Sequence, residues 1–147
     1  MKIAKKVKSL IDYYSVNFKI EEMPDGWGAS SNHIANSIQI NSKIKNKGQF
    51  YSLILHELGH IHCYKKGIWK NYHLNTMDIR CMNNKQKSIK VKIGFKVEKW
   101  IDNWAKKKFE ELKLCKKYKF IGFYIDNEKY AKKWYNEAYL NKFRNRL

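Results

Sequence analysis

The stretch that decides the fold runs from Leu53 to Ile61 and reads LILHELGHI. His56 and His60 are four residues apart, so on a helix both imidazoles lie on the same side and can reach one metal ion. Zinc takes neutral nitrogen ligands, and a hydrolytic site needs a nearby carboxylate to accept a proton from water. The H-E-x-x-H spacing therefore predicts a helix that binds Zn²⁺ through His56 and His60, with Glu57 as the general base.

The residues around this motif favour a metal site over the simpler interpretation, in which the three polar side chains lie on a solvated face. Leu53 to Leu55 and Leu58 surround them, and an apolar setting makes polar groups without partners costly, by roughly a few kcal/mol each. A metal ion supplies those partners. Gly59 has no side chain, so we expect another backbone segment to approach the helix there.

A third zinc ligand must come from elsewhere in the chain, because a catalytic zinc site generally takes three protein ligands. Lys66 stands where metzincins carry a histidine, which excludes that class. Glu98 shares the expected inward face of a helix with Ile101, and ligation would explain a carboxylate there. Asp102, one turn further, could accept the N–H of a ligand histidine; a plain alternative is that both acids pair with neighbouring lysines. The full set of candidates is His62, His73, Asp78, Glu98, Asp102 and the later acids.

Outside the motif, the spacing of apolar residues predicts a single α+β domain over residues 1–147, mostly helical, with a small sheet beside the motif helix. The predicted helices are Ile3 to Tyr14, Gly48 to Lys66 (ended by Gly67), Phe95 to Leu114 and Glu128 to Phe143. The predicted strands are Phe18 to Met23, Ile34 to Ile40 and Tyr118 to Ile125. Residues 68–92 show no clean period and are predicted to be loops, with a short helix at Leu74 to Met82.

The composition limits the partners. The chain has 147 residues and a formal net charge of +18, and only three of its 31 basic residues are arginines. A basic charge that comes mostly from lysine is weak evidence for a protein that recognises nucleic-acid sequence, because such proteins usually rely on arginine. A protein this basic should still bind polyanions weakly at low salt. Three widely spaced cysteines do not suggest a disulfide framework, and we find neither a signal peptide nor a stretch that would span a membrane. We therefore expect a cytoplasmic protein.

The chain resembles the ImmA/IrrE family of zinc metallopeptidases in two elements. In that family H-E-L-G-H is followed by a helix of the type E-x-x-A-D-x-W/F-A, and residues Glu98 to Ala105 read EKWIDNWA here. The strand Ser37 to Asn41 also resembles the family's edge strand, against which a peptide substrate would lie. The resemblance extends roughly from Ile34 to Leu112.

This resemblance implies a zincin-like metallopeptidase of gluzincin type, in which His56, His60 and Glu98 hold Zn²⁺ and Glu57 is the general base. It implies a protein or peptide substrate, and members of the family often cut a DNA-binding transcriptional repressor. The chain departs from the family in Ile101, which replaces a small residue, in the long basic connection before Glu98, and in having no separate helix-turn-helix or sensor domain.

Two alternatives remain open. In a DNA-associated protease of the SprT type, His73 would complete the zinc site, but the following Leu74-Asn75 lacks the expected His-Gly element. A non-catalytic protein on the same scaffold, with a role in phage defence and a basic surface that contacts nucleic acid, would not need Glu57. For an enzyme, the donor to the reaction's oxyanion could be His33, Tyr72 or His73. Cys63 is predicted to be a packed side chain and His62 to point away from the metal pair.

Overall fold

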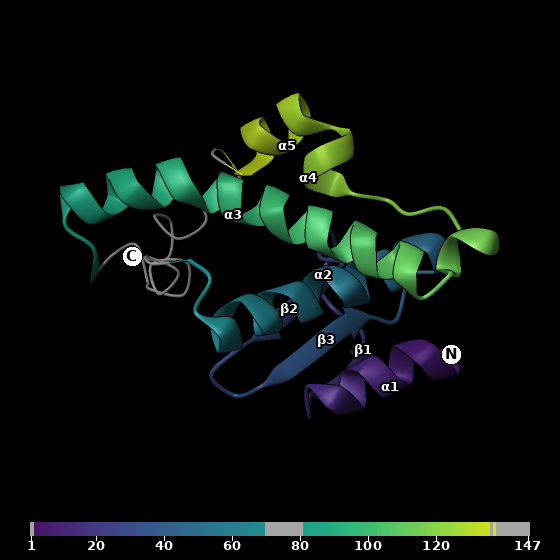
Figure 1. The fold of residues 1–147 in the computed structure, drawn as a ribbon. Coiled ribbons are helices and arrows are strands. Elements are labelled where there is room, and N and C mark those ends of the chain that lie inside the picture. The colour runs from purple at the N-terminus through teal and green to yellow at the C-terminus, as the bar shows by residue number, and fades with distance from the viewer. Residues whose placement is uncertain (1, 70–80, 136, 138–147) are drawn as a thin grey trace.

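The structure is a computed structural model that describes residues 2–69, 81–135 and 137. These residues form an α+β fold in which helices outweigh a small sheet (Figure 1). In chain order the elements are α1 (Lys5–Tyr13), β1 (Asn17–Glu21), β2 (Ala29–Asn32), β3 (Ser37–Asn41), α2 (Lys47–Lys66), α3 (Asn84–Glu111), the 3-10 helix η3 (Leu114–Lys116), α4 (Phe123–Asp126) and α5 (Glu128–Trp134).

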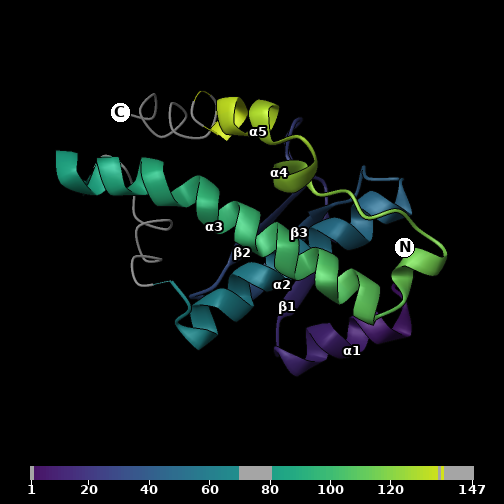
Figure 2. The ribbon, with the colours of Figure 1, turned by 45° about the horizontal axis from the view of Figure 1, so that its top comes forward.

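Helix α2 is the centre of the molecule. It packs on β2 and β3 on one side and on α3 on the other, so it lies between the sheet and α3 (Figures 1 and 2). Helices α4 and α5 follow the long α3, with α4 in contact with it. Any side chain on the α3 side of α2 is therefore held between two helices.

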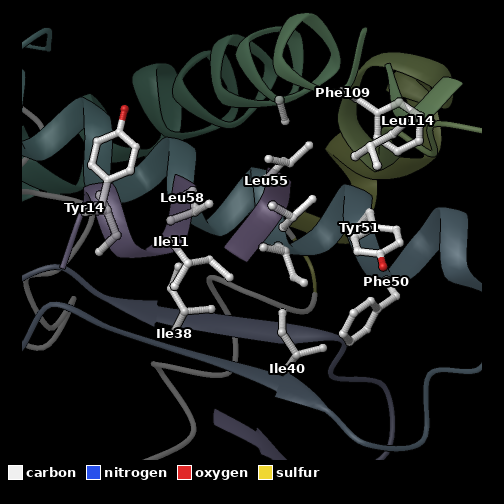
Figure 3. Packing of buried hydrophobic residues seen from close by; sticks show 14 of the residues in the cluster. Ile11, Tyr14, Ile38, Ile40, Phe50, Tyr51, Leu55, Leu58, Phe109 and Leu114 are labelled. Carbon is white, nitrogen blue, oxygen red and sulfur yellow. The ribbon is translucent and has the colours of Figure 1, made fainter. Parts of the chain in front are cut away.

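The sheet has the order β1-β3-β2, with β1 parallel and β2 antiparallel to β3. Ile38 and Ile40 of β3 are 2% and 0% exposed, and both point toward α2, where they meet Leu55 and Leu58 (Figure 3). Ile11 of α1 packs into the same cluster. Burying each of these aliphatic side chains contributes about 1.5–3 kcal/mol, which fixes α2 on the sheet.

Helix α2 confirms the helix predicted over Gly48 to Lys66. It starts at the cap residue Asn46, whose side chain accepts the backbone N–H of Gln49 at 2.9 Å, and it ends at Gly67, which adopts φ 60°. Its buried residues lie on several sides because the sheet and α3 cover opposite faces. Helix α1 lies within the predicted helix Ile3 to Tyr14. Strands β1 and β3 overlap the predicted strands Phe18 to Met23 and Ile34 to Ile40, but β1 begins one residue earlier, β3 ends one residue later, and Ile34 to Asn36 belong to a turn.

The prediction of loops up to residue 92 was wrong, because α3 begins at Asn84. A capping box starts it: Asn83 accepts the backbone N–H of Gln86 at 2.8 Å, and the Gln86 side chain accepts the N–H of Asn83 at 3.0 Å. The sequence contains this Asn-x-x-Gln signal, but the residues that follow it have no helical spacing of apolar side chains, so the helix start was not predicted. The short helix predicted at Leu74 to Met82 lies for most of its length outside the described residues.

The strand predicted over Tyr118 to Ile125 was also wrong. This segment packs against the start of α2: the Ser52 hydroxyl accepts the N–H of Ile121 at 2.9 Å, and the backbone oxygen of Lys119 would lie 2.3 Å from a Cβ on Gly48. It then enters α4 at Phe123. Its backbone forms a hydrogen bond with a side chain of α2 and pairs with no strand in the described part of the chain, although its apolar residues alternate as they would in a sheet.

Strand β2, with the sequence ASSN, was not predicted, because it lacks alternating apolar residues. It occupies one edge of the sheet, while β3 is central. The expectation that Ser37 to Asn41 is the edge strand was therefore wrong, because β1 and β2 lie at the two edges of the described sheet. The predicted last helix begins as expected, at Glu128, but most of its second half lies outside the described residues. Among the described helices, none is long and apolar enough to cross a lipid bilayer.

Candidate metal centre

Helices α2 and α3 bring the three predicted ligands together. The Nε2 atoms of His56 and His60 lie 2.8 Å and 3.2 Å from the same oxygen of Glu98, Oε2. The ligand atoms of the three residues all lie within 4.8 Å of one another, and the Glu98 side chain is 17% exposed. Because both imidazoles present Nε2 to one carboxylate, the three donors converge on a single point between the helices.

Asp102 lies behind this point. Its Oδ1 is 2.6 Å from Nδ1 of His56, on the side of the ring opposite Glu98. Its Oδ2 accepts the backbone N–H groups of Tyr124 at 2.7 Å and Ile125 at 3.3 Å, at the start of α4. Asp102 is 3% exposed. The carboxylate thus ties the predicted ligand His56 to the start of α4, and it fixes a proton on Nδ1, which leaves the Nε2 lone pair for a metal.

Gly59 allows α3 to pack closely against α2. A Cβ at this position would lie 2.7 Å from Cγ2 of Ile101 and 3.1 Å from Cε3 of Trp104, both on α3. Any side chain here would force the helices apart. The expected close approach at Gly59 is therefore confirmed, and it sets the distance between the histidines of α2 and Glu98.

The electrostatics of the cluster are those of buried, coupled groups. Burial alone would lower the pKa of His56, but its hydrogen bonds to Asp102 and Glu98 raise that pKa well above its ordinary value. Burial would raise the pKa of Glu98, but the charge of His60 and the hydrogen bonds from both histidines bring it far below its ordinary value. The Glu98 carboxyl therefore stays ionised, and without a metal the hydrogen bonds of His56 to Glu98 and Asp102 favour a proton on His56.

The donor set fits Zn²⁺. A tetrahedral zinc ion with ligands at about 2.0–2.1 Å separates its donor atoms by about 3.3 Å. The two separations from Glu98 Oε2, 2.8 Å and 3.2 Å, are shorter than this value by about half an ångström or less. Two imidazole nitrogens and one carboxylate, with a second carboxylate on the outer nitrogen of a ligand histidine, are characteristic of catalytic zinc sites.

Glu57, the predicted general base, is 8% exposed and follows the first ligand on α2. Its carboxylate acts electrostatically on the phenol of Tyr124 and helps to raise its pKa. The charges in this part of the site are acidic, from Glu57, Glu98 and Asp102.

Tyr124 is a site residue that the sequence did not reveal. Its ring stacks on that of His56, with centroids 5.6 Å apart and planes at 17°. Burial, followed by the charges of Glu98, Asp102 and Glu57, raises its pKa well above the ordinary value. It lies in the segment wrongly predicted to be a strand, and no spacing in the sequence relates it to the motif.

The other candidate residues lie elsewhere. His62 points away from the pair, as predicted: its Nδ1 is 2.8 Å from the Tyr14 hydroxyl, and its ring stacks on Trp104. Cys63 is 0% exposed and packs with Val97 and Ile101, which confirms a packed side chain.

His33, a candidate oxyanion donor, packs on Tyr64 with ring centroids 4.2 Å apart. Burial, followed by the charge of His60, lowers the pKa of His33. The remaining candidates, Tyr72, His73 and Asp78, lie outside the described residues.

Comparison of the chain with protein-family models, with curated proteins and with solved structures gives no match.

Proposed function

We propose that this protein is a zinc-dependent metallopeptidase. The observation that carries the proposal is the convergence of His56, His60 and Glu98, all within 4.8 Å, with Asp102 bound to the outer nitrogen of His56. The buried base Glu57 beside the cluster supports hydrolysis over a structural role, because a structural zinc site needs no such group and takes four protein ligands. We propose a minimal zincin-like fold for the same reason, and the α+β architecture with the edge strand β2 next to α2 supports it.

When bound by these residues, Zn²⁺ would supply a Lewis acid and make water nucleophilic near neutral pH. Glu57 takes one proton from the attacking water while the water oxygen bonds to the peptide carbonyl carbon and the carbonyl π pair moves onto its oxygen. When that pair returns, the C–N bond breaks, and the Glu57 carboxyl passes its proton to the leaving nitrogen. Atoms balance as one peptide plus one water giving a carboxylic acid and an amine.

The substrate we propose is an extended segment of a cytoplasmic protein, such as a transcriptional repressor. Among the residues that the structure describes, no strand pairs with the outer edge of β2, and the backbone groups there could bind such a segment. The resemblance to ImmA/IrrE peptidases supports a repressor, and three free cysteines support a reducing compartment.

The first test is the zinc content of wild type, Glu98→Ala and His73→Ala, purified in metal-free buffer and reloaded with one equivalent of Zn²⁺. Glu110→Ala, an exposed acid on the same helix, is the matched control. We expect bound zinc to be lost with Glu98→Ala and retained in the other two. Loss in His73→Ala with retention in Glu98→Ala would favour the SprT-type site.

The second test addresses catalysis without a known substrate. A peptide library made from a digested bacterial proteome is incubated with zinc-loaded wild type, Glu57→Gln and the control Glu110→Gln, and new termini are identified by mass spectrometry. We expect cleavage by wild type and Glu110→Gln, and a loss of at least a hundredfold in Glu57→Gln at unchanged zinc content. Equal results for wild type and Glu57→Gln would reject the peptidase and favour a non-catalytic scaffold.

A further inference from the structure

The lysines of this chain are concentrated at one end of the molecule. Three segments that lie far apart in the sequence, residues 2–8, 45–48 and 113–120, hold ten lysines and no acidic residue among their 19 positions, whereas the whole chain has 31 basic and 13 acidic residues among 147. The three segments meet around the start of α1, the start of α2 and η3 (Figures 1 and 2). We call this region the lysine end.

Contacts with the core fix the three segments relative to one another. The backbone N–H of Ala4 donates to the hydroxyl of Tyr51 on α2 at 3.0 Å. The ring of Tyr51 contacts that of Tyr118, with centroids 5.4 Å apart. The backbone oxygen of Lys119 leaves no room for a Cβ on Gly48, so the start of α2 touches the segment after η3. The lysines of these segments are therefore held close together by the fold.

A shallow hollow lies within the lysine end. Its volume is about 500 Å³, and it is lined by four exposed lysines and one acid, Glu110. None of the four lysines forms an ion pair with a carboxylate of the described residues, so the protein does not neutralise their charges. These hollow lysines are Lys106, Lys116, Lys117 and Lys119.

The other side chains of the hollow point to the kind of anion that it fits. Phe109 is 0% exposed, and its ring contacts that of Phe120, with centroids 5.4 Å apart. Phe120 and Tyr118 also pack against the core, so these rings are not open to the stacking of bases. Lysine binds phosphate as a point charge. The hollow therefore suits a phosphodiester backbone, whose charge is the same for every base sequence.

Two other kinds of polyanion fit the lysine end less well. A membrane surface is bound through apolar side chains as well as lysines, and the exposed large apolar residues of the described chain all lie outside the three segments. Protein interfaces are depleted in lysine and have aromatic or apolar anchors at their centre, which are packed inward here. A nucleic-acid duplex needs no such anchor, because it presents one negative charge per ~1.7 Å of its axis.

We propose that the lysine end binds the phosphodiester backbone of double-stranded nucleic acid without regard to base sequence, with the hollow lysines as its main contacts. This inference goes beyond the proposed peptidase and does not rest on it. His56 is eight residues from Gly48 along α2, or about 12 Å, so the duplex and the metal centre occupy different parts of this helix.

The test is fluorescence anisotropy of labelled DNA duplexes of about 20 bp, in two unrelated sequences, with the full-length protein at a series of salt concentrations. The hollow variant combines Lys106→Gln, Lys116→Gln, Lys117→Gln and Lys119→Gln. The control variant has the same net charge and changes four exposed lysines at the end of α2, at the start of α3 and on α5. It combines Lys66→Gln, Lys85→Gln, Lys129→Gln and Lys132→Gln.

At about 0.1 M salt we expect wild type to bind both duplexes with affinities within about threefold, and the hollow variant to bind at least about tenfold more weakly. The slope of log affinity against log salt should become shallower by about three to four, because each lost phosphate contact removes about one. The control variant should stay within about threefold of wild type, since charges more than about 10 Å away are screened at this salt. Thermal midpoint and zinc content should be the same in all three proteins.

An equal loss of affinity in the two variants would overturn the proposal, because binding would then follow net charge alone. So would a wild type that binds neither duplex at this salt. Tighter binding of wild type to polyglutamate, or to vesicles of phosphatidylserine and phosphatidylcholine, would also overturn it and assign the lysine end to an acidic protein or to a membrane.

A second measurement needs no substitution. Lysines of wild type are acetylated briefly with and without duplex, and the modification of each is quantified by mass spectrometry. We expect the duplex to protect the hollow lysines and to leave the four control lysines as reactive as in the free protein. Equal protection of both groups would refute a defined binding surface. Neither measurement depends on whether the protein cuts peptides, so this inference and the peptidase proposal can fail separately.

Discussion

Replacing Asp102 with asparagine should weaken zinc binding through the tautomer of His56. The Asp102 carboxylate accepts at 2.6 Å from His56 Nδ1 and at 2.7 Å from the N–H of Tyr124. Asparagine keeps one carbonyl oxygen for the Tyr124 amide and turns its NH₂ group toward His56. An NH₂ donor stabilises the tautomer with the proton on Nε2, which removes the lone pair that would bind the metal.

The size of the effect follows from this exchange. Loss of a carboxylate behind a ligand histidine typically weakens metal affinity tenfold to a hundredfold, or about 1.4–2.7 kcal/mol. The assay is competition for Zn²⁺ with a chromophoric chelator. Asp126→Asn is the control: Asp126 accepts the N–H of Gly122 at 2.8 Å, so it also supports α4, but it does not bond to His56.

Zinc affinity within a factor of two of wild type in Asp102→Asn would refute the reasoning, because the tautomer would then not depend on this carboxylate. An equal loss in Asp126→Asn would also refute it, since the effect would arise from the order of α4. The expected result is a loss confined to Asp102→Asn, with the free energy of unfolding of the metal-free protein measured in parallel by urea titration.

Three further predictions follow from the same geometry. Gly59→Ala places a methyl group 2.7 Å from Ile101 Cγ2 and should lower the free energy of unfolding by about 1–3 kcal/mol in urea titration, together with zinc affinity. Cys63 is buried, which raises its pKa to about 11, so Ellman's reagent at pH 8 should modify the two exposed cysteines of the native protein and reach Cys63 only after unfolding. The pKa of His56 is raised on folding; its contribution to the stability of the metal-free protein is therefore complete below the unfolded value near 6.5 and lost as pH rises through the folded value, and thermal midpoints should fall above neutral pH. Zinc-loaded protein, in which the metal replaces that proton, should show a flatter profile.

The parts of the site that the sequence predicted are those governed by helical periodicity. His56 and His60 share a face because they are four residues apart, and so do Glu98 and Asp102. Each pair could therefore be predicted from the spacing within a single helix. The two pairs can meet because Gly59 has no side chain, and the prediction that another segment approaches the helix closely at Gly59 is confirmed.

What the sequence missed depends on tertiary contacts. Tyr124 reaches His56 because Ser52 and Asp102 bond the backbone on either side of the turn into α4, and neither contact has a sequence period. The alternating residues of that segment therefore predicted a strand. The opposite error concerns strand β2, which was not predicted. Pairing with β3 makes the sequence ASSN a strand, although its composition does not favour one. In both cases backbone hydrogen bonds to distant residues decided the structure.

The charge of the centre gives an independent reason to expect a cation there. A chain with a net charge of +18 gathers three of its 13 acidic residues, Glu57, Glu98 and Asp102, around one histidine pair. Buried carboxylates repel one another and lose hydration, so the arrangement costs stability unless positive charge is placed among them. In the metal-free protein a proton on His56 supplies one such charge. A divalent ion bound at Nε2 supplies two while Asp102 keeps its hydrogen bond at Nδ1, so metal binding relieves more of the repulsion than protonation does, and the cluster should prefer the metal increasingly as pH rises.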